Sequence, residues 1–274
     1  MTDLGDLPPG DEIPPAAQPL LPHAPHRVAG DRGAGWIVEG WDCFKAATVP
    51  WLMLSVLWLA LLLVVEYSVL LGAVHSLLKP VWAAGFLMAC HAQYRGERVD
   101  PRALFAGFTR RFGSLVLVGV LQFCLYVAVL ALFLGPVFID LVSALFPDRT
   151  LLDLDLQEEL PAALESLSPQ ELMLLIDPSA LALRVLLLLL VLLPLLAAFW
   201  FAPALLLLGD CSLGEALRLS LRGTLRNVWP FLIYGFCGAL LALLVPITLG
   251  AALLVLVPVY YLSLYLSYRD IFID

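Results

Sequence analysis

The segment from Ser212 to Val245 reads SLGEALRLSLRGTLRNVWPFLIYGFCGALLALLV, an amphipathic half followed by a long apolar half. Ser212 with Glu215 three residues later forms a capping box, which predicts the start of a helix. A four-residue spacing places three arginines on one face of that helix: Arg218, Arg222 and Arg226. The amphipathic half is therefore predicted to lie in the plane of a membrane surface.

The apolar half begins at Val228, and no charged residue occurs from there to Leu249, four residues beyond the quoted segment. Its length matches the roughly 20 apolar residues that cross about 30 Å of hydrocarbon. The whole chain is 62% hydrophobic and only 14% charged, whereas an average soluble domain has roughly 25% charged residues. These values indicate an integral membrane protein. Because no run of basic residues occurs, nucleic acid is not expected as a partner.

The first 34 residues are rich in proline and acidic side chains and contain few large apolar ones. Such a composition buries too little surface to offset the entropy lost on ordering, so we predict a disordered tail over 1–34. The acidic residues stand where a signal peptide would be basic, so we expect the first spanning helix to direct insertion.

From residue 35 to 274 we predict one all-α transmembrane domain of six spans. The spans are expected at about 49–71, 77–94, 113–138, 181–208, 228–249 and 251–268. They group into three units, 35–94, 100–208 and 212–268, each with an amphipathic segment followed by two spans. Because two spans return the chain to its starting side, successive units should be parallel.

Helix-start signals support this division. Asp100 before Pro101 and Asp177 before Pro178 each place an N-cap ahead of a first-turn proline. Two further prolines, Pro194 and Pro203, should kink the fourth span. Between 147 and 178 lies an acidic loop, where Ser168 begins a pattern typical of a short helix.

Basic residues are distributed asymmetrically between the two predicted sides. Twelve of the 15 Lys and Arg residues fall in the tail, the amphipathic segments, the connection over 95–99 or the C-terminus, and only Lys79, Arg149 and Arg184 fall on the other side. The positive-inside rule therefore predicts cytoplasmic termini and a periplasmic acidic loop, in a bacterial inner membrane.

Basic residues of the amphipathic segments are candidate contacts for anionic lipid headgroups. Each basic residue near such a surface contributes about 1 kcal/mol. The candidates are Arg218, Arg222, Arg226, Arg110 and Arg111. The simpler interpretation, anchoring by the positive-inside rule without lipid specificity, remains open beside it.

Glu66 is the charge deepest in the first span, and an ionisable residue there suggests function. It lies near the outer end of that span, and Lys79 begins the next span on the same side. A structural Glu66–Lys79 ion pair is therefore favoured over a proton or ion site. Asp140 and Arg184 could pair in the same way.

No catalytic chemistry is predicted. The chain contains neither GxSxG nor HExxH, and its histidines are divided between the tail and opposite membrane faces. The five cysteines lack metal-binding spacing and are expected to be inert apolar residues. We therefore expect no enzyme activity, no metal and no cofactor.

Two motifs near the ends of the membrane domain carry a family resemblance. They are Gly-Trp-x-x-x-Gly-Trp-x-x-Phe at Gly35–Phe44 and Tyr-Leu-Ser-Tyr-Arg-Asp-Ile-Phe at Tyr265–Phe272. With the spacing of Pro80 and Gly85, they resemble a proteobacterial family of six-span inner-membrane proteins without an established activity. The layout is similar to the membrane domain attached to some glycerophosphodiester phosphodiesterases. The resemblance implies a location and an architecture but no substrate.

Two functions remain open at this stage. The first is a non-catalytic role in membrane organisation or as an accessory to an envelope partner, with membrane lipids and an unidentified membrane protein as partners. The alternative is a carrier or channel for a small or lipidic solute. A carrier should have a water-accessible pocket at mid-membrane, and the spans offer few polar residues for one: Gln122, Tyr126, Ser55 and Thr248.

Overall fold

The structure, a computed structural model, describes residues 22–65, 68–150, 153, 155, 157–168, 170 and 177–274. Within these residues all regular elements are helical. They are α1 (Arg32–Ala46), α2 (Thr48–Val65), α3 (Val69–Tyr94), η2 (Pro101–Phe105), α4 (Ala106–Thr109), α5 (Phe112–Leu145), α6 (Glu159–Glu165), α8 (Pro178–Trp200), α9 (Ala202–Leu207), α10 (Leu213–Arg226), α11 (Val228–Ala242), α12 (Leu244–Ile247) and α13 (Leu253–Phe272). The predicted all-α class is confirmed.

Five helical stretches in the described part of the chain are long and apolar enough to cross a membrane. They are Thr48–Val65, Leu71–Tyr94, Phe112–Leu145, Pro178–Leu207 and Val228–Ile247. The sixth predicted span falls in α13, which is 20 residues long but is interrupted by tyrosines, serines and the pair Arg269 and Asp270. The structure therefore supports a multi-pass helical protein with five candidate spans among the described residues, and it does not confirm the predicted six spans or their three parallel units.

The chain divides into two compact units, which we describe separately. The first contains residues up to Val120 together with Ala197–Asp274, and the second contains Leu121–Leu196. The first unit holds both ends of the described chain and most of the buried side chains.

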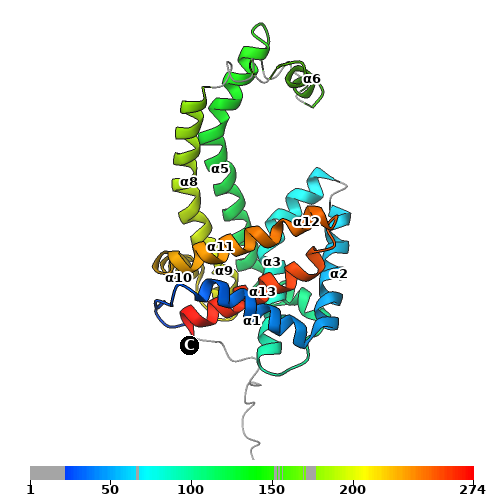
Figure 1. Ribbon diagram of the computed structural model, residues 1–274, viewed down its shortest axis with the longest axis vertical. Coiled ribbons are helices and arrows are strands. Elements are labelled where there is room, and N and C mark those ends of the chain that lie inside the picture. The colour runs from blue at the N-terminus through cyan, green and yellow to red at the C-terminus, as the bar shows by residue number, and fades with distance from the viewer. Residues whose placement is uncertain are drawn as a thin grey trace, which may run out of the picture. The chain divides into compact units, whose positions relative to one another are not determined.

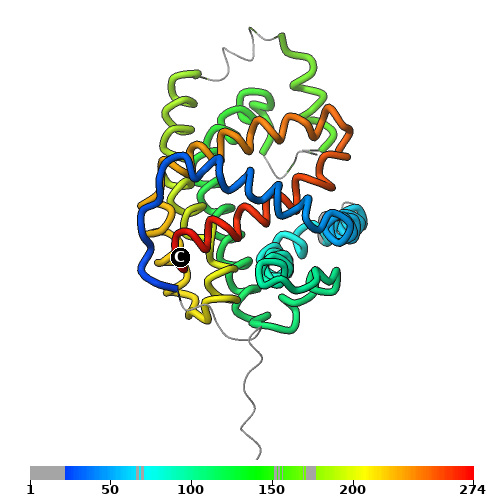
Figure 2. The backbone as a smooth tube through the Cα atoms, turned by 60° about the horizontal axis from the view of Figure 1, so that its bottom comes forward, coloured from blue at the N-terminus to red at the C-terminus, as the bar shows by residue number. Residues whose placement is uncertain are grey.

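Within the first unit, α1 packs lengthwise between α11 and α13 (Figures 1 and 2). The start of α1 lies beside the start of α11 and the end of α13, so α1 runs parallel to α11 and antiparallel to α13. The predicted interfacial position of this helix is not tested, but its apolar stripe packs against protein. Sequence periodicity identified an apolar stripe, but a stripe that faces lipid and a stripe that faces protein have the same period.

Two glycines allow α1 to approach its neighbours closely. A Cβ atom at Gly33 would collide with the carbonyl oxygen of Pro230 in α11. A Cβ atom at Gly40 would lie 3.1 Å from both the Ser263 nitrogen and the Val259 oxygen in α13. Trp36 and Phe44 complete the buried stripe, with Trp36 fully buried. Small residues at helix contacts are common in membrane proteins because packing drives association there.

The second predicted surface helix is also packed against protein. It consists of η2 and the single turn α4, and both contact α3. Gly85 of α3 lies against the Leu104 carbonyl, and Gly107 of α4 lies against the Val81 carbonyl, so the two backbones meet directly. Asp100 caps this segment as predicted, because its Oδ1 accepts the Arg102 backbone N–H at 2.9 Å.

α3 is longer than predicted. It begins at Val69, eight residues before the expected start at 77. Residues 72–76, which we expected to form the turn between the first two spans, are part of the helix. Gly72 has no atom outside its own helix within 4 Å, so nothing at that position forces a break. A single glycine weakens a helix but does not end it.

The third amphipathic helix, α10, covers a break between α8 and α9. The kink predicted near Pro203 is a full interruption at Phe201. Ser220 of α10 is completely buried and accepts the Phe201 backbone N–H at 2.9 Å, and its hydroxyl donates to the Ala197 carbonyl at 2.7 Å. α10 thereby supplies the hydrogen bonds that the interrupted helix has lost, as membrane proteins with broken helices require.

The second unit contains the far part of α5, the short helix α6 and the first part of α8. Asp177 caps α8 as predicted, with Oδ1 accepting the Ser179 backbone N–H at 2.9 Å. Arg149 pairs with Glu159 in the acidic connection. Arg184 lies 3.9 Å from Asp140, at the limit of an ion pair. Most of the short helix predicted after Ser168 lies outside the described residues.

The described end of the N-terminal segment, residues 22–31, is held against the first unit. The backbone N–H of His23 donates to the Phe272 carbonyl at 2.7 Å, and that of His26 donates to the Ile271 carbonyl at 3.2 Å. The Asn227 side chain accepts the Val28 N–H at 2.9 Å and donates to the His26 carbonyl at 2.9 Å. We predicted a disordered tail through residue 34; residues 22–31 instead have specific backbone partners, and α1 begins at Arg32. The earlier part of the tail lies outside the described residues.

Candidate functional site

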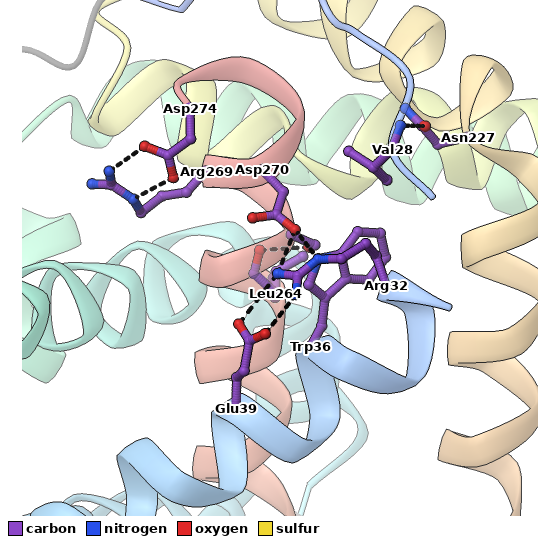
Figure 3. Close-up of polar contacts among 10 residues, drawn as sticks. Val28, Arg32, Trp36, Glu39, Asn227, Leu264, Arg269, Asp270 and Asp274 are labelled. Carbon is purple, nitrogen blue, oxygen red and sulfur yellow. Dashed lines mark hydrogen bonds and ion pairs between the residues drawn. The ribbon is translucent and has the colours of Figure 1, made fainter. Parts of the chain in front are cut away.

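The two motifs that carry the family resemblance meet in space. Asp270 of α13 receives two hydrogen bonds on Oδ2, from Arg32 Nε at 2.6 Å and from Trp36 Nε1 at 2.7 Å. Arg32 also donates to Glu39, at 2.5 Å and 3.2 Å to its two carboxylate oxygens. We call these four residues, Arg32, Trp36, Glu39 and Asp270, the clasp (Figure 3).

One guanidinium in the clasp faces two carboxylates. The hydrogen bond to Glu39 raises the pKa of Arg32 above its ordinary value, and Asp270 adds to this rise while burial opposes it. The carboxylates of both acids bind one guanidinium, whose planar fork suits such an arrangement. The clasp thus joins α1 to α13 and leaves its own polar groups occupied.

Other residues of the closing motif contact α3. The Tyr265 hydroxyl shares a hydrogen bond of 2.9 Å with His91 Nδ1, and both side chains are buried. The Arg269 guanidinium lies 3.9 Å from the centre of the Tyr94 ring, a cation–π contact, and pairs with Asp274.

The motif's last residue, Phe272, reaches α9 and α10. Its ring packs edge-on against Phe201 at 5.3 Å between centroids, and it fills the space beside Gly223. The closing motif therefore contacts three regions of the first unit: α1, α3 and the α9–α10 pair. Its residues act as a structural junction.

A small groove of about 240 Å³ lies beside this junction. Two cysteines, Cys43 and Cys90, line it with Gln93, whose side chain donates to the Cys43 carbonyl at 2.7 Å and accepts from Trp51 Nε1 at 2.6 Å. Burial raises the pKa of the Cys43 thiol, with smaller contributions from Glu39 and Asp42. A raised pKa disfavours the thiolate, so Cys43 is a poor nucleophile or metal ligand.

The described residues form neither a disulfide nor a cluster of metal-ligating side chains. All five cysteines are free. Within the described ranges no three His, Cys, Asp or Glu side chains gather where they could hold a metal ion.

The candidate lipid-binding arginines are placed differently from one another. Arg218 and Arg222 project from the exposed face of α10, and Arg110 is exposed at the end of α4. Arg111 instead donates to the carbonyls of Asp210 and Cys211, at 3.1 Å and 3.3 Å, and pairs with the Asp210 carboxylate. These contacts do not test lipid binding, but they show that Arg111 already has a structural role.

Arg226 is exposed and donates to the Pro25 carbonyl at 3.1 Å. The predicted Glu66–Lys79 ion pair is not tested, because Glu66 lies outside the described residues. Lys79 is exposed on α3.

Of the polar residues considered for a carrier, Gln122 and Thr248 form hydrogen bonds to residues four positions away in the chain. Gln122 Nε2 donates to the Tyr126 hydroxyl at 3.1 Å, one turn further along α5. Thr248 Oγ1 donates to the Leu244 carbonyl at 2.7 Å. Ser55 is buried in α2, and its hydroxyl has no partner among the described residues. The hydrogen bonds of Gln122 and Thr248 give no positive support to a carrier.

The apolar part of α11 presents an open face. Leu232, Phe236 and Leu240 are 57%, 66% and 52% exposed. Gly235 and Gly238, on the same helix, have nothing within 4 Å of an added Cβ, in contrast to the tightly packed glycines of α1. The sequence predicted a span here, and α11 belongs to the candidate span Val228–Ile247. The sequence did not indicate which face of α11 is uncovered.

Together, the helices and their apolar surfaces define a multi-pass helical membrane protein. The chain is 28% identical over 267 residues to a protein of Burkholderia thailandensis described as a probable inner membrane protein, with 89% of this chain and 92% of the relative covered. No family model matches the chain, and no solved structure matches it. The resemblance to the six-span family and to the phosphodiesterase membrane domain therefore rests on the motifs alone.

Proposed function

We propose that the protein is a non-catalytic inner-membrane protein that organises the membrane or assists an envelope partner through lateral helix contacts. The observation that carries this proposal is the open face of α11, where Leu232, Phe236 and Leu240 are exposed at four-residue spacing and Gly235, at the edge of that face, has nothing within 4 Å of an added Cβ. An exposed glycine in a span allows another helix to approach closely. The description of the Burkholderia relative supports the inner-membrane location.

The contacts of the closing motif support a structural role. Tyr265, Arg269 and Asp270 each bind a side chain of another part of the chain.

We further propose that both termini face the cytoplasm. The exposed arginines of α10 and the exposed Arg110 support this orientation through the positive-inside rule. A periplasm-specific reporter enzyme fused after Asp274 should be inactive, and one placed in the connection near Asp148 should be active. The reverse pattern would overturn the orientation.

Photocrosslinking in cells tests the contact surface. A photoreactive amino acid at Phe236 should give a discrete crosslinked product, to a membrane protein or to a second copy of the chain. Gly235→Leu should weaken that product, because it adds a side chain at the edge of the face. Leu132, which is 69% exposed on α5, provides the matched control. Equal products from both positions, or none from Phe236, would contradict the proposed role.

A further inference from the structure

A second groove lies where the N-terminal segment meets the junction of α10 and α11. Its volume is about 590 Å³. Five side chains define its chemistry: Arg27, Leu225, Arg226, Val228 and Trp229. We call it the arginine groove.

The charges of the arginine groove are positive. Arg27 and Arg226 line it, and no carboxylate is among its lining residues. Arg27 is exposed and forms no ion pair with any described residue. Guanidinium groups present planar N–H donors that match phosphate oxygens. The groove is therefore complementary to an anionic phosphate group.

The remaining lining is apolar and exposed. Trp229 is 66% exposed, Leu225 is 53% exposed and Val228 is 47% exposed. They lie at the start of α11, where the candidate span Val228–Ile247 begins. Tryptophan is enriched at the boundary between headgroups and acyl chains. A ligand that fits this lining has an apolar part next to its phosphate.

The residues around the groove are fixed by contacts within the protein. Asn227 is 1% exposed and bonds the backbone of Val28, His26 and Gly223, which fixes the N-terminal segment to the helix junction. Gly30 packs directly against the Trp229 indole. A site that is already ordered binds its ligand at a lower entropic cost.

We propose that the arginine groove binds the headgroup of an anionic phospholipid, with the phosphodiester between Arg27 and Arg226 and the acyl region beside Trp229. This site goes beyond the proposed contact through α11 and does not depend on it, because Gly235 and Gly238 are outside the groove. It also differs from general attraction to an anionic surface, in which all exposed arginines would contribute alike.

The chain offers a matched control for this difference. Arg218 and Arg222 are exposed on α10 but do not line the groove. The variants Arg27→Gln/Arg226→Gln and Arg218→Gln/Arg222→Gln therefore remove the same charge from the same part of the protein. A further single variant, Arg27→Gln, leaves the hydrogen bond from Arg226 to Pro25 in place.

The full-length protein, purified in detergent, would be titrated with short-chain phosphatidylglycerol and phosphatidylcholine and followed by native mass spectrometry. The groove double variant should bind phosphatidylglycerol about tenfold or more weakly, since each basic residue near an anionic headgroup contributes substantially. Arg27→Gln should lose part of that affinity, and the α10 control should stay within about threefold because neither of its arginines lines the groove.

Three results would overturn the proposal. Equal losses in the groove and α10 variants would show general surface attraction. Unchanged affinity in Arg27→Gln and in the groove double variant would show that the groove is not the site. Glycerol 3-phosphate binding as tightly as the lipid would show a site for soluble phosphates. Circular dichroism of each variant should match the unsubstituted protein, so that a loss of binding reports on the groove.

Discussion

α1 and α10 have the same sequence pattern, an amphipathic helix directly before an apolar span, but their surroundings differ. α1 is packed between α11 and α13, and its charged residues Arg32 and Glu39 bind within the molecule. α10 buries only a narrow stripe of small residues and exposes its arginines. Amphipathicity therefore predicts that a helix has an apolar stripe, but it does not show how much of the helix surface other helices cover.

The largest effect is expected from closing the contact between α1 and α13. Gly40→Leu places a side chain where the Ser263 and Val259 backbones lie 3.1 Å away, so α1 must move. Overpacking of this kind typically costs about 3 kcal/mol or less, and more where backbone atoms block the side chain. Unfolding in detergent measures the loss. Gly214→Leu on the open face of α10 is the control and should change stability little.

A smaller loss is expected on the buried side of α10. Ser220→Ala leaves the Phe201 N–H and the Ala197 carbonyl without their partner in a buried site. An unsatisfied buried polar group costs about 1–3 kcal/mol. Thr248→Ala removes a hydroxyl that donates to the Leu244 carbonyl and accepts the Ala252 N–H, and it should cost less because these groups are exposed. Equal losses in the two variants would contradict the role of Ser220 at the helix break.

The packing of α1 also predicts a pH effect on Cys43. Because burial raises its pKa, the reactive thiolate forms only at higher pH than for an exposed cysteine. In a variant that keeps only this cysteine, maleimide labelling should be slower than for Arg218→Cys in the same background. Its rate should continue to rise with pH after the control has reached its plateau. Matching pH profiles would show that α1 is exposed.

The smallest effect on stability is expected from the exposed face of α10. Arg218→Gln with Arg222→Gln should change the free energy of unfolding by less than about 0.5 kcal/mol per site, as is usual for surface substitutions. Thermal unfolding of the double variant in detergent provides the measurement. A loss as large as that of Ser220→Ala would show that these arginines are structural.

Several elements could be predicted from sequence because their signals are local. The caps at Asp100, Asp177 and Ser212 and the apolar spans depend on residues within a few positions of one another. The number of spans could not be settled from the sequence because the tyrosines and serines of α13 suit both a membrane interface and a packed aromatic core. Only tertiary contacts separate the two.

Less of the candidate site than of the fold could be predicted from the sequence. The opening and closing motifs were each recognised, but their contact joins residues more than 200 positions apart, from Trp36 to Asp270. The arginine groove depends on residues 22–31, which the composition assigned to a disordered tail. Proline-rich composition describes an average tendency and does not show that specific backbone hydrogen bonds hold part of such a segment.

The central claim, that the clasp joins the two ends of the membrane domain, is tested most directly by a double-mutant cycle. Arg32→Gln, Asp270→Asn and the double variant would be unfolded in detergent, with Arg222→Gln and Asp270→Asn as the control cycle. The clasp predicts a coupling energy of about 0.5–3 kcal/mol for the first pair, as for residues that share an ion pair, and none for the control. Additive effects of Arg32→Gln and Asp270→Asn would contradict it.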